Sequence, residues 1–135
     1  MTVRRYQDLL AWQLADELKR EVYELVDNSS ARNDFNFRDQ IMRSASSAPS
    51  NIAEGFGYYR HAEFGRHLRI AKSELAETHN HLGDGVDRHH WSPTQAKPIQ
   101  DLADRAIAVS TRLLQHLATT EAPRRWKEKK RRKKG

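Results

Sequence analysis

The chain has 135 residues with no cysteine, 37% hydrophobic residues and a mean hydropathy of −0.92. A domain of this length buries enough surface to fold unaided, and the lack of cysteine excludes disulfides, thiolate catalysis and cysteine-ligated zinc. No uninterrupted apolar run is longer than the four residues 9–12, whereas a membrane span needs about 20 residues. Gln7 and Asp8 stand where a signal peptide would be apolar. We therefore expect a soluble, cytoplasmic protein without a membrane partner.

The positive charge is concentrated at the C-terminal end of the sequence. The formal net charge is +6, but residues 124–135 hold nine of the 24 Lys and Arg residues and one of the 18 acidic residues. This segment therefore carries +8, while residues 1–123 carry −2. Because a dense block of one charge repels itself, the sequence predicts a folded domain at 1–123 and a disordered basic tail at 124–135.

Four stretches show the apolar periodicity of amphipathic helices, and none alternates as a strand would. In chain order they cover about residues 6–27, 36–56, 61–82 and 96–118. The apolar stripe of the first stretch consists of Leu10, Leu14, Leu18, Val22 and Leu25. The stripe of the third consists of Phe64, Leu68, Ala71, Leu75, Thr78 and Leu82. The second and fourth stretches have similar stripes.

Proline, glycine and capping residues mark the ends of these stretches. Pro49 falls inside the second and is expected to kink it, and Gly83 and Gly85 are expected to end the third. Ser92 and Pro93 form a start signal for the fourth, as N-cap and first helical residue. Helices of about 20 residues with short connections predict an all-α, antiparallel, up-and-down four-helix bundle.

The middle of the chain carries a distinctive motif, which consists of Asn51, Ile52, Ala53, Glu54 and Gly55. Three other segments carry the same resemblance to known proteins as this motif. They are residues 6–12, 37–45 and 63–77, of which the last two flank it. Over about residues 5–120 the chain resembles the four-helix-bundle proteins encoded in intervening sequences of bacterial large-subunit ribosomal RNA genes. It is distantly similar to the accessory proteins of diversity-generating retroelements.

This resemblance implies a bundle that assembles as a ring, typically a homopentamer. The distantly similar accessory proteins use the same architecture to bind nucleic acid and a reverse transcriptase. Free-standing members of the family mostly have no established activity. The resemblance therefore indicates fold and assembly more strongly than function.

Within the motif, Asn51 and Glu54 are three residues apart and hence neighbours on a helix. One interpretation makes them a polar site at the ring interface or a ligand contact. The other has them satisfying backbone or arginine donors around Pro49 and Gly55. We favour the second, because buried polar groups near a helix break are usually paired.

Large apolar residues also occur away from the predicted core. Leu9, Trp12 and Tyr23 fall on the face of the first helix opposite its apolar stripe, and Ile70 points outward on the third. Because aromatic residues are enriched in interface cores, we expect a homo-oligomer with these four residues between subunits. The alternative is that loops of the same chain shield them.

Two groups of basic residues are candidates for contact with nucleic acid. Arg43, Arg60, Arg66 and Arg69 could form a strip that touches phosphates; the alternative is an ordinary solvated helix face, on which Glu63, Glu74 and Glu77 pair with them. The tail offers Arg124, Arg125, Trp126, Lys127, Lys129, Lys130, Arg131, Arg132, Lys133 and Lys134. Such arms commonly bind polyanions, and Trp126 could stack on an unpaired base. A purely solubilising tail is the alternative.

The sequence offers no catalytic or metal-binding constellation. His79 and His81 point away from each other on a helix, and no Glu-x-x-His or His-Glu-x-x-His arrangement is present. Glycine-rich phosphate loops and nucleophile elbows are also absent. We therefore expect no metal, no cofactor and no enzymatic activity.

Two functions remain open at this point. The first is a non-enzymatic, oligomeric nucleic-acid-binding protein, with RNA preferred to DNA because of the family resemblance. The second is an interaction scaffold, a ring that docks a partner protein such as a reverse transcriptase.

Overall fold

The computed structural model describes residues 3–58 and 60–120 of the chain. Its four long helices are α1 (Leu10–Asp27), α2 (Phe35–Phe56), α3 (His61–Asp87) and α4 (Pro93–Thr119). Two short 3-10 helices come before α1 and α2, namely η1 (Tyr6–Asp8) and η2 (Ser30–Asn33). The described residues contain no strand, and the predicted all-α class is confirmed.

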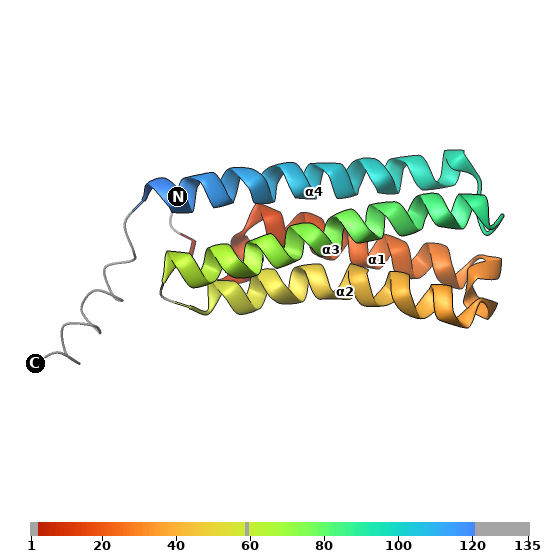
Figure 1. Ribbon diagram of the computed structural model, residues 1–135, viewed down its shortest axis with the longest axis horizontal. Coiled ribbons are helices and arrows are strands. Elements are labelled where there is room, and N and C mark those ends of the chain that lie inside the picture. The colour runs from red at the N-terminus through yellow and green to blue at the C-terminus, as the bar shows by residue number, and fades with distance from the viewer. Residues whose placement is uncertain (1–2, 59, 121–135) are drawn as a thin grey trace, which may run out of the picture.

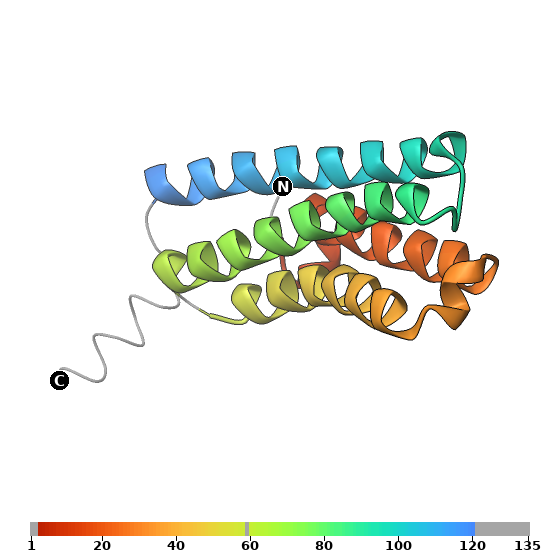
Figure 2. The ribbon, with the colours of Figure 1, turned by 45° about the vertical axis from the view of Figure 1, so that its right-hand side comes forward.

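The four helices form an antiparallel, up-and-down bundle (Figure 1). Helices α1 and α3 each pack against both α2 and α4. Every helix therefore contacts its two neighbours around a shared core, and a rotated view shows the same arrangement (Figure 2). The predicted bundle is confirmed, while its assembly into a ring stays a prediction.

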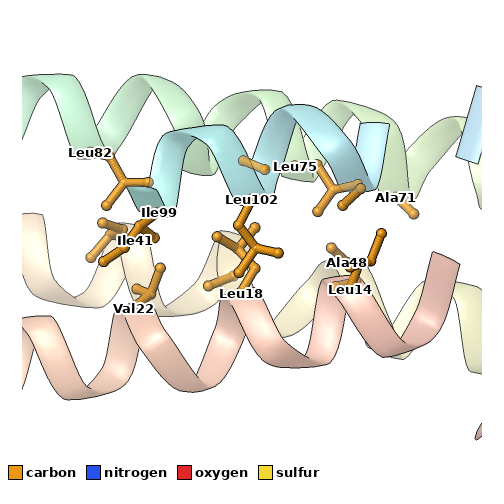
Figure 3. Close-up of a cluster of buried hydrophobic side chains, with 14 of the residues drawn as sticks. Leu14, Leu18, Val22, Ile41, Ala48, Ala71, Leu75, Leu82, Ile99 and Leu102 are labelled. Atoms are coloured by element: carbon orange, nitrogen blue, oxygen red, sulfur yellow. The ribbon is translucent and has the colours of Figure 1, made fainter. Parts of the chain in front are cut away.

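Aliphatic side chains from all four helices fill the core (Figure 3). Leu18, Ile41 and Leu75 are completely buried there. Many small residues are also part of the core, and the alanines with no exposed surface are Ala15, Ala31, Ala45, Ala48, Ala71, Ala96, Ala103 and Ala106. Because interiors are close-packed, this alanine content brings the helix backbones close together.

The start of α1 corrects the predicted register of its first turn. Leu9, expected on the outer face, is buried at 8% exposure, whereas Leu10, expected in the core, is 52% exposed. The helical wheel fails for Leu9 because this residue is not helical, and it fails for Leu10 because the buried face of α1 consists of Ala11, Leu14, Ala15, Leu18, Val22 and Val26. Leu9 follows η1 with an extended backbone (φ −75°, ψ 126°), and α1 begins only at Leu10. Leu9 is therefore a core residue of its own chain and not an interface residue.

The C-terminal end of α3 corrects a second prediction. Gly83 and Gly85 do not end the helix, which continues to Asp87. Gly85 is buried against Trp91, and a Cβ built on it would lie 2.1 Å from Cζ2 of that indole. Trp91 in turn donates from Nε1 to the carbonyl of Leu82 at 2.8 Å. The glycine at position 85 makes room for a side chain instead of ending the helix.

The helix ends instead in a Schellman motif at His89. The amide of His89 donates to the carbonyl of Val86, and the amide of His90 donates to that of Gly85. His89 has a φ of 63°, the only positive value at a non-glycine residue in the part of the chain described. This left-handed conformation is one that glycine normally adopts at a helix end.

Replacing His89 by glycine is expected to raise the free energy of unfolding by about 1 kcal/mol, because glycine adopts the left-handed region without steric cost. Urea denaturation of the wild type and H89G measures the change. The matched control is Asp87→Gly at the last helical residue, where glycine should lower the stability by a similar amount. A less stable H89G would contradict the prediction and show that the imidazole contributes to the turn.

Helix α4 begins where the sequence predicts a start signal. The Ser92 side chain accepts from the amide of Gln95 at 3.1 Å, and the Gln95 side chain accepts from the amide of Ser92 at 2.9 Å. This capping box supports a first turn that begins at Pro93. The helix then runs through Pro98, just as α2 runs through Pro49.

Candidate nucleic-acid interface

The motif at residues 51–55 packs against α3 near the end of α2. Ile52 lies in the core and is completely buried. A Cβ built on Gly55 would lie 2.6 Å from Cβ of His67 and 3.1 Å from Cδ1 of Phe64. No larger residue fits at this position without displacing α3. Ala53 is half-buried and Glu54 is exposed.

Asn51 connects this motif to His67 on α3. Its Nδ2 donates to the carbonyl of Ser47 at 3.0 Å, and its Oδ1 lies 3.3 Å from Nδ1 of His67. Since an amide oxygen only accepts, His67 donates from Nδ1 and its Nε2 accepts from Arg66 Nη2 at 3.2 Å. The ring of Tyr58 stacks on the imidazole at 5.3 Å. Hydrogen bonds from the motif therefore orient Arg66 on the surface.

The predicted arginine strip is only partly assembled. Arg60, Arg66 and Arg69 lie together at the start of α3 and are exposed. Arg43 lies farther along the bundle and pairs with Glu77 at 2.7 Å and Glu74 at 3.5 Å. Arg43 therefore does not belong to the strip, because two carboxylates of α3 neutralise its charge.

Charge is separated along α3 and its N-cap. Residues 60–72 hold four Lys and Arg residues and one acid, whereas residues 74–87 hold four acids and no Lys or Arg. Arg66 pairs with the one acid in the basic half, Glu63, at 3.5 Å. Arg69 forms no ion pair with any residue that the structure describes. One end of the bundle therefore presents a cluster of cations, here called the basic end and defined by Arg60, Arg66, Arg69 and Lys72.

The C-terminus of α4 lies at the same end of the bundle (Figure 1). Nδ1 of His61, at the start of α3, lies 3.3 Å from both the carbonyl and the hydroxyl oxygen of Thr120. Thr120 is the last described residue, and in the sequence the basic segment 124–135 begins four residues later. The predicted binding residues of that segment lie outside the described residues. Thr120 itself lies beside the basic end.

The acidic half of α3 contains two carboxylates with opposite pKa shifts. Burial is the main cause that raises the pKa of Glu74, and the charge of Glu77 adds to it. Burial also opposes ionisation of Glu77, but hydrogen bonds from His81 and Arg43 outweigh it and lower the pKa of Glu77. Arg43 and His81 thus hold an ionised Glu77 between α2 and α3.

A further polar cluster closes the opposite end of the bundle, and no local sequence pattern predicts it. Oδ2 of Asp34 accepts from His90 Nε2 at 2.9 Å and from Arg88 Nη1 at 3.1 Å. The His90 hydrogen bond is the main cause that lowers the pKa of Asp34, and Arg88 adds to it. Ser30 Oγ lies 2.7 Å from the other ring nitrogen of His90. The cluster ties the start of α2 to the turn between α3 and α4.

The remaining predicted interface residues are half-buried within the single chain. Trp12, Tyr23 and Ile70 all have intermediate exposure. Tyr6 of η1 packs edge-on against Trp12, with ring centroids 5.2 Å apart. A neighbouring segment of the same chain therefore covers part of Trp12, and contact of these three residues with a second subunit stays a prediction.

The histidines for which no metal site is expected have different acidic partners. His79 lies 3.6 Å from Asp104, and His81 lies 3.3 Å from Glu77. Within residues 3–58 and 60–120, no group of three or more acidic or imidazole side chains is placed to hold a metal ion. None of the helices described is both long enough and apolar enough to cross a lipid bilayer.

Comparisons with known proteins agree with this architecture. A crystal structure of a protein of unknown function from the S23 ribosomal protein family of Bacteroides thetaiotaomicron superimposes with a TM-score of 0.70 at 21% sequence identity. The similarity covers 78% of this chain and 98% of that one and supports the fold alone. No curated protein matches the chain. The family described as 23S rRNA-intervening sequence protein matches residues 7–112, and the chain therefore belongs to this family.

Proposed function

We propose that this protein is a non-enzymatic, oligomeric nucleic-acid-binding protein whose ligand is RNA. The observation that carries the proposal is the contact between His61 and Thr120 at the basic end, because Thr120 stands only four residues before the basic segment 124–135 in the sequence. In this proposal the tail and the bundle contribute cations to one surface, where they contact the phosphates of a polyanion. The family description, which refers to 23S rRNA, supports RNA over DNA.

The separation of charge within the bundle also supports the proposal. Within α3 and its N-cap, the Lys and Arg residues fall in residues 60–72 and all but one of the acids in residues 74–87. The helix dipole does not account for this distribution, because the first turn holds the acid Glu63, which the dipole favours, and the last turn holds Asp84 and Asp87, which it disfavours. A polyanion bound at one end would be attracted by the cations there.

Truncation of the chain after Pro123 is expected to weaken binding of a labelled single-stranded RNA more than tenfold at moderate salt. The bundle should keep its circular dichroism spectrum, since all four helices end before that point. If about five tail cations contact phosphates, the log–log slope of affinity against salt for the full chain should be about −3.5. The slope should become much shallower after truncation.

The matched control replaces two cations at the opposite end, Arg32→Ala and Arg38→Ala, and should leave the affinity nearly unchanged. Equal affinity of truncated and full chains would show that the tail is incidental. The basic end would then be the place to search for the RNA contacts.

For the oligomer, we expect light scattering to return a mass several times the 15.7 kDa of one chain. The family resemblance implies a pentamer. Trp12→Ala should weaken the assembly more than it weakens the bundle, because aromatic residues contribute strongly to interfaces. Ala76→Leu, an exposed change on α3, serves as the control. A wild-type mass near that of one chain would contradict the assembly, and unfolding of W12A without prior dissociation would place Trp12 in the core.

A further inference from the structure

An apolar pocket opens between the start of α3 and the end of α4, at the basic end. Its volume is about 360 Å³, within the range of small-ligand sites. Ala62 and Gly65 of α3 face Leu114 and Leu117 of α4 across it. A Cβ built on Gly65 would lie 3.6 Å from Cδ2 of Leu114, so the missing side chain at position 65 leaves part of this space open.

The rim of this pocket is cationic. Arg69 lines it, and its Nη1 lies 3.6 Å from the position of a Cβ on Gly65. Arg69 forms no ion pair within the described part of the chain. His61 also lines the pocket and is the residue that contacts Thr120. The pocket therefore combines apolar walls with the guanidinium of Arg69 and the imidazole of His61, and it lies beside Thr120, four residues before the basic segment 124–135 in the sequence.

We propose that this pocket receives one unpaired base of a single-stranded RNA, and we name it the base pocket. The inference rests on the proposed function and adds the form of the ligand. A base presents an apolar face and carries a phosphate one sugar away, which matches leucine walls next to Arg69. A base within a duplex is stacked on both faces and cannot enter. An apolar peptide side chain would match the walls, but the cations of the basic end favour a polyanion.

Filling the base pocket tests the proposal without removing any charge. The filled variant combines Gly65→Ala with Ala62→Leu, which adds carbon atoms only. The new Cβ at position 65 makes ordinary contacts, and alanine is a better helix former than glycine. The matched control combines Gly83→Ala with Ala76→Leu on the same helix, where a Cβ at 83 would lie 3.6 Å from Gln100 Nε2.

Two labelled probes separate the base from the charge. One is a ten-nucleotide oligoadenylate, and the other is an abasic strand with the same number of phosphates. The full wild-type chain should bind oligoadenylate about tenfold more tightly than the abasic strand, because one stacked base contributes about this factor. The filled variant should lose this preference and keep its affinity for the abasic strand. The control variant should behave as the wild type.

The other outcomes overturn the inference in distinguishable ways. If neither strand binds to the wild type, the proposed function fails. If both bind equally, or if the filled variant keeps the preference, RNA binding stands and the base pocket is wrong; Trp126→Ala then tests stacking by the tail. If filling the pocket changes the solution mass, the pocket seats a second copy of the chain and not a base.

Discussion

Substitution of Gly85 by alanine is expected to lower the free energy of unfolding by about 4 kcal/mol. The new Cβ would lie 2.1 Å from Cζ2 and 2.8 Å from Nε1 of Trp91. The indole cannot move aside locally, because it is 5% exposed and donates to the carbonyl of Leu82. Expelling it costs as much as removing a buried tryptophan, about 3–5 kcal/mol. The substitution also leaves that carbonyl without its side-chain donor.

Urea denaturation measures this loss, and hydrogen exchange of the Trp91 indole reports whether the ring has left its site. Gly83→Ala, two residues earlier in the same helix, is the matched control. Its Cβ would make only an ordinary contact with Gln100, so it should stabilise the protein by about 0.5–1 kcal/mol. Equal stability of the two variants would show that Trp91 does not depend on Gly85.

Substitution of Gly55 by alanine is expected to cost about 3 kcal/mol, because the new Cβ would overlap Cβ of His67 at 2.6 Å. The close atom is attached directly to the backbone, so no change of rotamer relieves the overlap and α2 must separate from α3. That separation also stretches the hydrogen bond between Asn51 and His67, which is 3.3 Å long in the native bundle.

Thermal and urea unfolding test this prediction, with Gly65→Ala as a control in which the added methyl group has room. Truncating His67 to alanine in the G55A background should not restore stability, since the Cβ that causes the overlap remains. Recovery in this double variant would mean that the imidazole, and not the helix separation, determines the cost.

The helices and most of the core could be predicted from apolar spacing alone. Leu14, Leu18 and Val22 are buried as their periodicity indicates. The start of α1 is where apolar spacing fails. Leu9 has an extended backbone before the helix begins and is buried, whereas Leu10 is helical but lies outside the buried face. Apolar spacing describes residues within a helix and does not show where the helix begins.

Contacts between distant residues were beyond the reach of the sequence. A glycine such as Gly85 is typical of a helix end, and only the position of Trp91 shows that this glycine makes room for the indole side chain. Asp34 and His90 are 56 residues apart, and no local pattern pairs them. Arg43 was grouped with Arg66 by charge, although its carboxylate partners on α3 neutralise it. At the candidate interface, the sequence predicted the types of residue but not which cations are already paired.

The closed order of the helices has a consequence for how the chain folds. Three of the four helix–helix interfaces join consecutive helices, namely α1–α2, α2–α3 and α3–α4. Their contacts span short stretches of sequence and can therefore form rapidly. The fourth interface joins α1 to α4, and it cannot form until about a hundred residues have been synthesised. During synthesis, the apolar face of α1 that later meets α4 therefore stays uncovered until the last helix emerges. We expect the contact between α1 and α4, which joins the first helix to the last, to be the slowest of the four to form.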